Sequence, residues 1–179
     1  MTNKTEKQIL LEVQLDWQGG TKGVLSSNDA KDVTGAIHVG THPELGGTGE
    51  PWTAEHLLLG SIVSSFMSTF FKLARKQHVE VSHFECNIIG QVNMLEGKYK
   101  FTNINLYPKV YIIDEVLRKK INLLLLETYQ SSIIINSISA HVFYHGEVLP
   151  DQHPRLSPEA ETDKSLASVI RGQVRSFPY

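Results

Sequence analysis

A chain of 179 residues is long enough for one domain and an appendage, but not for two full domains of ordinary size. Its 17 basic and 19 acidic residues give a formal charge of −2, which excludes a general electrostatic attraction to nucleic acid or anionic lipid. The single cysteine, Cys86, excludes an intrachain disulfide, a CxxC redox motif and a cysteine-based zinc cage. We therefore expect a cytoplasmic protein with no nucleic-acid or membrane partner, since the charged N-terminus lacks the pattern of a signal peptide.

Strand and turn patterns dominate the first part of the chain. Apolar and polar residues alternate over residues 9–17, as in a half-buried strand. Gly19-Gly20 predicts a turn into a second strand over residues 23–27, so that the two strands form a hairpin. Residues 34–39 predict a third strand.

A glycine- and proline-rich loop leads into a long helix. Residues 42–52 (HPELGGTGEPW) contain three glycines and two prolines, a composition typical of a loop. Thr53 is a good N-cap for a helix over residues 54–77, and Glu55 suits the positive end of the helix dipole. Its apolar residues wrap more than one face, which predicts a central helix. We do not expect a membrane span, because Gly60 and several serines interrupt the apolar run.

A stripe of small residues follows one side of this helix. Its members lie at positions i, i+3, i+4 and i+7, and they are Ser61, Ser64, Ser65 and Ser68. Small side chains along a stripe allow a neighbouring element to approach closely. We therefore expect the helix to pack tightly against another element along these serines.

The middle of the chain predicts a long β-hairpin followed by a second helix. Residues 80–94 and 98–113 are rich in strand-forming side chains, and the Leu-Glu-Gly sequence between them predicts the hairpin turn. Asp114 is a good N-cap for a helix over residues 115–129. The side of this helix that we expect to be buried consists of Val116, Leu117, Ile121, Leu124 and Leu125.

The C-terminal part is less regular. Residues 130–135 are ambiguous, and residues 137–145 predict a last strand. The composition changes after Gly146, which predicts one domain over residues 1–149 and a C-terminal extension over residues 150–179. We expect this extension to be a linker that includes a short helix.

The order of the elements is typical of the α+β class, with antiparallel sheets packed against a long central helix and a second helix. Two helices leave much of the strand surface uncovered in a single chain. The sequence therefore predicts a homodimer.

Three short motifs resemble the OsmC/Ohr family of osmotically inducible protein C and the organic hydroperoxide resistance proteins. In ELGGTGEPWTAEHLLLGSIVSSF, the TAEHLL sequence is similar to the family's helix start, and Val63-Ser64-Ser65-Phe66 is similar to its small-small-Cys-Phe element. Residues 132–138 (SIIINSI) resemble the second element, in which a cysteine precedes Asn-Ser or Asn-Ala. WQGGTKG resembles a Gly-Gly-Arg-x-Gly turn, and the resemblance extends from about Leu11 to Val148.

This resemblance implies an OsmC-like fold, an intertwined homodimer with active sites at the subunit interface, and a stress-related thiol peroxidase reaction. In the family, one cysteine attacks an organic hydroperoxide, a second forms a disulfide with it, and an arginine positioned by a glutamate lowers the thiolate pKa. Here the cysteine positions fall on Ser65 and Ser132, the arginine position falls on Thr21, and the glutamate is kept as Glu55. A serine hydroxyl is hardly ionised at neutral pH and forms no sulfenic acid, so we predict a degenerate site.

Each of these residues also has an ordinary structural interpretation. Ser65 and Ser132 are either polar residues of a retained pocket or small core residues whose hydroxyls bond to the carbonyl four residues back. Glu55 is either a pocket carboxylate or a first-turn residue that complements the helix dipole. Cys86 has no basic neighbour in the sequence and is expected to be buried and inert. No HExxH or comparable cluster is present, so we expect neither a metal nor a cofactor.

Three functional hypotheses follow. The first is an OsmC/Ohr-like homodimer that binds a small apolar molecule in an interface pocket. The residues assigned to this pocket are Ser65, Ser132, Glu55, Trp52, Phe66 and Met67. The second is an enzyme of another class in which Glu55 and His56 carry out acid–base chemistry. The third is a structural dimer that binds a protein partner through its C-terminal tail.

The first hypothesis makes a geometric prediction. The side chains of Ser65 and Ser132 should lie close together, because they correspond to two cysteines that form a disulfide. Glu55 lies ten residues before Ser65 on the same helix, or about 15 Å along its axis, and cannot reach Ser65 of its own chain.

Overall fold

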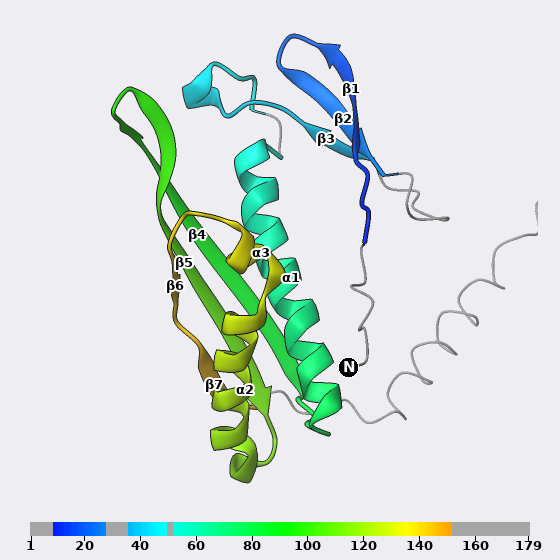
Figure 1. Cartoon of the computed structure of the whole chain (residues 1–179), viewed down its shortest axis with the longest axis vertical. Coiled ribbons are helices and arrows are strands. Elements are labelled where there is room, and N and C mark those ends of the chain that lie inside the picture. Colours follow the sequence, from blue (N-terminus) through cyan, green and yellow to red (C-terminus); the bar gives the residue numbers. More distant parts are fainter. Residues whose placement is uncertain (1–8, 28–35, 50–51, 152–179) are drawn as a thin grey trace, which may run out of the picture.

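The computed structural model describes residues 9–27, 36–49 and 52–151, and Figure 1 shows their arrangement. In chain order, the elements are β1 (Gln14–Gly19), β2 (Lys22–Ser26), β3 (Ile37–Val39), the 3-10 helix η1 (Pro43–Leu45), α1 (Ala54–Lys76), β4 (His83–Leu95), β5 (Lys98–Ile112), the 3-10 helix η2 (Glu115–Leu117), α2 (Arg118–Ser131), α3 (Ile133–Ser137), β6 (Val142–Tyr144) and β7 (Glu147–Pro150).

The first three strands form a small antiparallel sheet in the order β1-β2-β3. Gly19 and Gly20 make the turn of the predicted first hairpin with φ angles of 104° and 56°, which glycine adopts without steric cost. The hairpin is therefore confirmed. The expectation of a half-buried first strand is wrong for the single chain, where Leu15 is 57% exposed and Trp17 is 73% exposed. More than half of each side chain's surface is therefore left in water by the rest of the described chain.

Helix α1 follows the predicted boundaries closely. The Thr53 side chain caps it by accepting a hydrogen bond from the backbone N–H of His56, and the helix ends at Lys76. Its buried stripe consists of Ile62, Phe66, Phe70 and Ala74. By length and composition this helix could also cross a membrane. Its buried stripe packs on the sheet, and 22% of its apolar window is buried within the described chain.

The predicted long hairpin is confirmed as strands β4 and β5, which pair antiparallel from His83–Tyr111 to Leu95–Lys98. Glu96 and Gly97 form the turn with φ angles of 53° and 75°, the combination that a tight two-residue hairpin turn requires. A register irregularity between Gln91 and Val92 lies in the outer half of the hairpin. The inward face of β5 is buried through Ile104, Leu106, Val110 and Ile112.

The second helix begins later than predicted. Asp114 caps the short η2 helix by accepting from the Val116 N–H at 2.9 Å, and α2 proper begins at Arg118. Val116 was expected to be buried, but it is 84% exposed because this turn precedes the packed part of the helix. Ile121, Leu124 and Leu125 are buried as predicted.

The expected last strand over residues 137–145 needs correction. The described chain has helix α3 up to Ser137, followed by two short strands, β6 and β7, that each pair parallel with β5. The isoleucine-rich segment has a high intrinsic strand propensity, which tertiary packing against α1 overrides here. Strand β7 ends at Pro150, beside the predicted domain boundary. The rest of the predicted C-terminal extension, with its short helix, lies outside the described residues.

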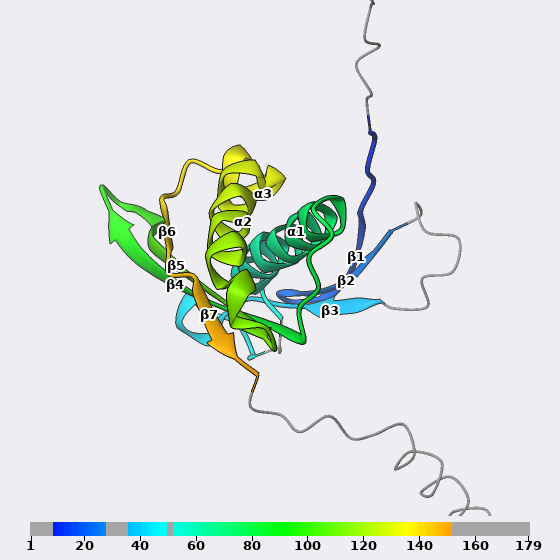
Figure 2. The same cartoon turned by 90° about the horizontal axis from the view of Figure 1, so that it is seen from below.

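Helices α1 and α2 lie on the same face of the sheet that contains β4, β5, β6 and β7 (Figure 2). The core lies between the helices and the sheet, and α3 joins it through contacts with both helices. The N-terminal sheet is attached to the start of α1 by a hydrogen bond from the Gly40 N–H to the Trp52 carbonyl at 2.9 Å.

Candidate functional site

The Ser65 and Ser132 side chains are in direct contact. Their Oγ atoms lie 3.1 Å apart, within hydrogen-bond distance, although the residues are separated by 67 positions in the chain. Ser65 comes from the middle of α1, and Ser132 is the residue that precedes α3. Ser132 is fully buried. The predicted proximity of the two side chains is therefore confirmed.

Ser65 also supplies a cap to α3 from another element. The backbone N–H of Ile134, in the first turn of α3, donates to Ser65 Oγ at 3.4 Å. Ser132 makes no side-chain capping bond of its own at this helix start. Of the two alternatives, the one with a bond from each hydroxyl to the carbonyl four residues back is not seen for Ser65 and Ser132, whose hydroxyls connect α1 with the start of α3.

The rest of the serine stripe behaves differently. Ser61 donates to the Leu58 carbonyl at 2.7 Å and Ser68 donates to the Ser64 carbonyl at 2.9 Å, which are ordinary local bonds. Ser64 and Ser68 are exposed in the single chain. Close packing along the stripe, as predicted, is therefore seen at Ser65 but not along its whole length within one chain.

The other residues assigned to an interface pocket have different environments. Phe66 is fully buried, with its ring 6.5 Å from that of Phe84 and 6.3 Å from that of Tyr144. It belongs to the core of the single chain, which corrects its assignment as a pocket-lining residue. Met67 is 42% exposed and Trp52 is 48% exposed, so both are accessible from the surface.

The positions that correspond to the arginine and the glutamate lie away from the serine contact. Thr21 is exposed in the turn between β1 and β2. Glu55 lies in the first turn of α1, about three helical turns before Ser65. Within one chain, neither residue has a recorded hydrogen bond to the two serines.

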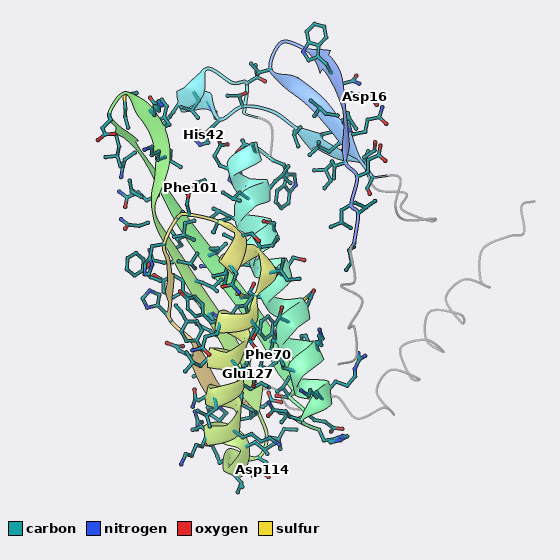
Figure 3. The ribbon with its side chains drawn as sticks, viewed as in Figure 1. Asp16, His42, Phe70, Phe101, Asp114 and Glu127 are labelled. Atoms are coloured by element: carbon teal, nitrogen blue, oxygen red, sulfur yellow. The ribbon has the colours of Figure 1, made fainter. Side chains whose placement is uncertain are left out.

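Glu55 instead lines a separate cavity of about 320 Å³ at the start of α1. Four segments form its walls: the loop around η1, the first turns of α1, the middle of β4 and the beginning of β5. His42 from the loop and Phe101 from β5 lie in this region between the start of α1 and the hairpin (Figure 3). This cavity is not among the sites predicted from the sequence.

Thr53 connects two titratable residues of this cavity. Its Oγ1 donates to Glu55 Oε2 at 2.5 Å and lies 3.1 Å from His56 Nδ1. A hydroxyl has one proton, so Thr53 accepts at its contact with His56, and Nδ1 of His56 carries a proton. In the neutral imidazole, Nε2 is then the acceptor. The Thr53 hydrogen bond, together with the Glu55 backbone N–H, holds the pKa of the Glu55 carboxyl below its usual value.

Metal binding is not suggested by this arrangement. Among residues 9–27, 36–49 and 52–151, no group of three or more His, Cys, Asp or Glu side chains has a geometry that could hold a metal ion. His42 and His56 are both part of the cavity wall, but their imidazoles are accounted for by contacts with the loop and with Thr53.

A sequence profile described as OsmC-like protein matches residues 47–144, which is more than half of the chain. The chain belongs to the OsmC-like family. The match includes the end of the loop before α1, the whole of α1, the long hairpin, α2, α3 and β6. It therefore includes both serines of the contact described above. No curated protein sequence matches this OsmC-like chain.

Solved structures share the fold of this OsmC-like protein at low sequence identity. An OsmC-like protein of unknown function from Vibrio cholerae is 15% identical with a TM-score of 0.68, over 78% of this chain and 99% of that one. An organic hydroperoxide resistance protein from Elizabethkingia anophelis is 13% identical with a TM-score of 0.62, over 82% and 100%. The organic hydroperoxide resistance protein OhrB of Bacillus subtilis is 19% identical with a TM-score of 0.51, over 78% and 98%.

The thiol of this OsmC-like chain is part of neither the serine contact nor the lining of the cavity. Cys86 lies on β4, paired with Pro108 of β5, and packs against the core. Burial raises the pKa of the Cys86 thiol to about 12, so that the thiolate is rare at neutral pH. This agrees with the prediction of an inert cysteine.

Sequence reasoning missed most of the cavity in this OsmC-like protein. Tyr99, Phe101 and Gly90 line it from two strands whose facing depends on the register of a long hairpin. The sequence does point to Glu55 and His56, which both line the cavity, as acid–base candidates. It predicts the glycine-rich segment before Thr53 only as a loop, and it does not connect these residues with the hairpin.

Proposed function

We propose that this OsmC-like protein is a stress-related homodimer in which the thiol peroxidase site is degenerate and a small apolar molecule binds at the subunit interface. The observation that carries the proposal is the 3.1 Å contact between Ser65 Oγ and Ser132 Oγ. The resemblance assigns these two positions to the reacting cysteines of the family. The two side chains lie side by side as that reaction would need, but both carry a hydroxyl oxygen in place of a thiol sulfur.

Two hydroxyls cannot perform the reaction of two thiols. Peroxidation needs a thiolate that becomes a sulfenic acid and then a disulfide, and a serine oxygen undergoes neither change. Cys86 does not replace them, because burial raises its thiol pKa to about 12 and its strand places it outside the contact. We therefore propose that the positions of the two reacting side chains are kept and that the peroxidase reaction is lost.

The proposed homodimer accounts for apolar surface that one chain leaves in water. In the N-terminal segment Leu11 is 83% exposed and Trp17 is 73% exposed, and on α1 Met67 and Phe71 are 42% and 41% exposed. Exposed apolar side chains of this kind are often buried by a partner, and their burial releases about 25 cal/mol per Å². A second copy would also cover the exposed serines of the α1 stripe.

The proposed preference for an apolar ligand follows from the loss of charge. The resemblance places a guanidinium where this chain has Thr21. Within the described residues, the hydrogen-bond partners of the two serine hydroxyls are neutral groups. A ligand carboxylate would lose its hydration there without compensation, whereas a neutral apolar molecule would not. A cytoplasmic location is inferred from the composition and stays a prediction.

Native mass spectrometry of the full chain purified from its own host tests this proposal. We expect a dimer that carries a reproducible additional mass, which organic solvent extracts. Ser65→Leu should reduce the bound mass because it fills the contact, whereas Glu127→Gln, on exposed α2 surface, should retain it. A monomer at micromolar concentration would contradict the dimer, and a dimer without additional mass in repeated preparations would contradict the ligand.

One observation favours a second candidate, an acid–base enzyme of another class. The Glu55–Thr53–His56 hydrogen bonds fix the protonated nitrogen of His56, an arrangement that prepares a general base. A panel of p-nitrophenyl esters provides a first test. Turnover that His56→Gln abolishes and His145→Gln leaves intact would support this candidate, and equal background rates in all three proteins would exclude ester hydrolysis.

A further inference from the structure

The buried Ser132 side chain decides the direction of the hydrogen bond between the two serines. Its Oγ lies 3.1 Å from Ser65 Oγ, and within the described part of the chain this is its one hydrogen-bond partner. If Ser65 were the donor, the proton of the fully buried Ser132 hydroxyl would have no acceptor, which is costly. Ser132 therefore donates this hydrogen bond, and Ser65 accepts it.

The Ser65 oxygen then accepts two hydrogen bonds. The second donor is the backbone N–H of Ile134 at 3.4 Å. This N–H lies in the first turn of α3, where the helix itself offers no carbonyl partner. A hydroxyl oxygen has two acceptor positions and one proton. Both acceptor positions of Ser65 are therefore occupied, while its proton is still available.

The Ser65 proton has no acceptor among residues 9–27, 36–49 and 52–151. In this respect Ser65 differs from its neighbours in the stripe, because Ser61 and Ser68 donate to backbone carbonyls of α1. Ser65 is half-buried and the adjacent Ser64 is exposed. The proton is therefore available to a molecule that lies against this side of α1.

The surroundings of this proton favour a neutral ligand with an apolar body. Ile133, which directly follows Ser132, is 71% exposed in the single chain and offers aliphatic surface beside the contact. The two groups that bond to Ser65 Oγ are a hydroxyl and a backbone amide, and neither carries a charge. A ligand carboxylate would thus exchange its hydration for one neutral donor.

The occupied acceptor positions restrict the ligand further. A ligand hydroxyl would bring a proton of its own, and the Ser65 oxygen has no free position to accept it. A hydrocarbon would leave the Ser65 proton without a partner once water is excluded. A carbonyl oxygen meets both requirements, because it accepts a hydrogen bond and brings no proton.

We propose that the interface pocket binds a neutral apolar carbonyl compound, such as a ketone or an ester, whose oxygen accepts a hydrogen bond from Ser65 Oγ. This inference rests on the proposed function, since it names the chemical class of the small apolar molecule. Ser65 discriminates against ligands with a hydroxyl group, organic hydroperoxides included, because their protons would be left unpaired.

Calorimetric titration of the full-length protein tests the proposal, after a hydrophobic resin has removed any molecule that is already bound. The probes are 2-octanone, 2-octanol and octanoate. We expect 2-octanone to bind about fivefold or more tightly than 2-octanol, the value of one hydrogen bond, and octanoate not to bind. Equal or tighter binding of 2-octanol or octanoate would overturn this inference and leave the proposed pocket intact.

The absence of binding also has a defined meaning. If none of the probes binds to a dimer that carries an additional mass when purified from its host, this inference is wrong and the proposed function stands. If none binds and the dimer also carries no additional mass, the proposed function itself is contradicted, and this inference with it.

The infrared carbonyl band of bound 2-octanone identifies the donor. We expect this band at lower wavenumber than in hexane, because a hydrogen bond weakens the C=O bond. Ser65→Ala should abolish both the shift and the preference for the ketone, whereas Glu127→Gln, on exposed α2 surface, should retain both. A band shift that persists in Ser65→Ala would contradict the proposal.

Ser132→Ala provides a second and independent variant. It frees one acceptor position on Ser65, so it should keep the band shift and strengthen 2-octanol binding about threefold or more. Because Ser65→Ala removes a stabilising contact, Ser132→Ala decides the outcome if the first variant does not fold. An unchanged ratio of 2-octanone to 2-octanol affinity in Ser132→Ala would contradict the proposed direction of the serine hydrogen bond, and the inference with it.

Discussion

Two regions of α1 differ sharply in chemistry although they lie about three helical turns apart. At the middle of the helix, Ser65 meets the buried hydroxyl of Ser132 in a neutral contact between two helices. At its start, Glu55 and His56 line an open cavity with a glutamate and a histidine from the loop. The resemblance assigns the reacting groups to the first region, but the titratable groups are gathered in the second.

The difference teaches where chemistry can still occur in this chain. The half-buried Ser65 hydroxyl and the buried Ser132 hydroxyl bond to each other and offer neither a proton acceptor of useful basicity nor a redox group. The helix start offers an ionised carboxylate and an imidazole in an accessible cavity. The contact between the two serines and the titratable side chains therefore lie at different places along one helix.

The largest expected effect concerns the thiol that lies in neither region. Burial raises the Cys86 pKa to about 12 from the usual 9.0, so iodoacetamide at about pH 8 should label it roughly a thousandfold more slowly in the native than in the unfolded protein. Mass spectrometry of timed samples measures both rates. A native labelling rate within tenfold of the unfolded rate would show that Cys86 is a reactive thiol and would contradict its assignment as inert.

The serine contact should contribute to stability more than the rest of its stripe does. Ser65→Ala removes the partner of the buried Ser132 hydroxyl and of the Ile134 N–H, which should cost about 1–3 kcal/mol in the free energy of unfolding. Ser68→Ala removes an exposed local bond and should change stability by less than about 0.5 kcal/mol. Urea unfolding compares the two variants. Equal losses in the free energy of unfolding would show that the Ser65–Ser132 contact stabilises the fold no more than an exposed local bond does.

At the other region, Thr53→Ala should have an intermediate effect. It removes the N-cap of α1 and the bond to Glu55, which should cost about 0.5–2 kcal/mol. The matched change Thr69→Ala, at an interior position of the same helix, lacks the capping loss. Thermal unfolding distinguishes them, and a Thr53→Ala variant as stable as the wild type would show that the cap does not position this region.

The smallest expected effect is the pH dependence that Glu55 contributes. Its pKa is lowered from 4.5 in the folded chain, so its stabilising contribution is complete above about pH 4.5 and is lost as the pH falls through the folded value. Melting temperatures between about pH 6 and pH 3.5 should therefore fall slightly less in Glu55→Gln than in the wild type. An identical fall in both proteins would show that Glu55 is not held by Thr53.

Features that depend on local sequence patterns could be predicted, whereas features that depend on contacts between distant elements could not. The cap at Thr53, the hairpin turn and the apolar stripe of α1 depend on local patterns, and the sequence predicts them closely. The contact between Ser65 and Ser132 was predictable only through the family resemblance, because no local pattern connects residues on different helices. The cavity was missed because it depends on how a loop, a helix and a hairpin meet.

The helix α3 shows the same limit on a smaller scale. Its isoleucines favour a strand locally, but the Ile134 N–H is capped by Ser65 from another helix. Strand β6, which is shorter than the predicted last strand, and strand β7, which lies beyond it, likewise depend on parallel pairing with β5. Such contacts between residues far apart in the chain outweigh local propensity, so the local sequence does not predict them.

The central claim is that the serine contact occupies the position of the family's cysteine pair and has lost its reaction. Organic hydroperoxide consumption with a dithiol reductant, measured for the wild type and for Ser65→Cys/Ser132→Cys in a Cys86→Ser background, tests it most directly. We expect the wild type to stay at the background rate, and the variant to consume peroxide and form an intrachain disulfide between positions 65 and 132. Peroxide consumption by the wild type, or a folded variant whose two thiols fail to pair, would contradict the account.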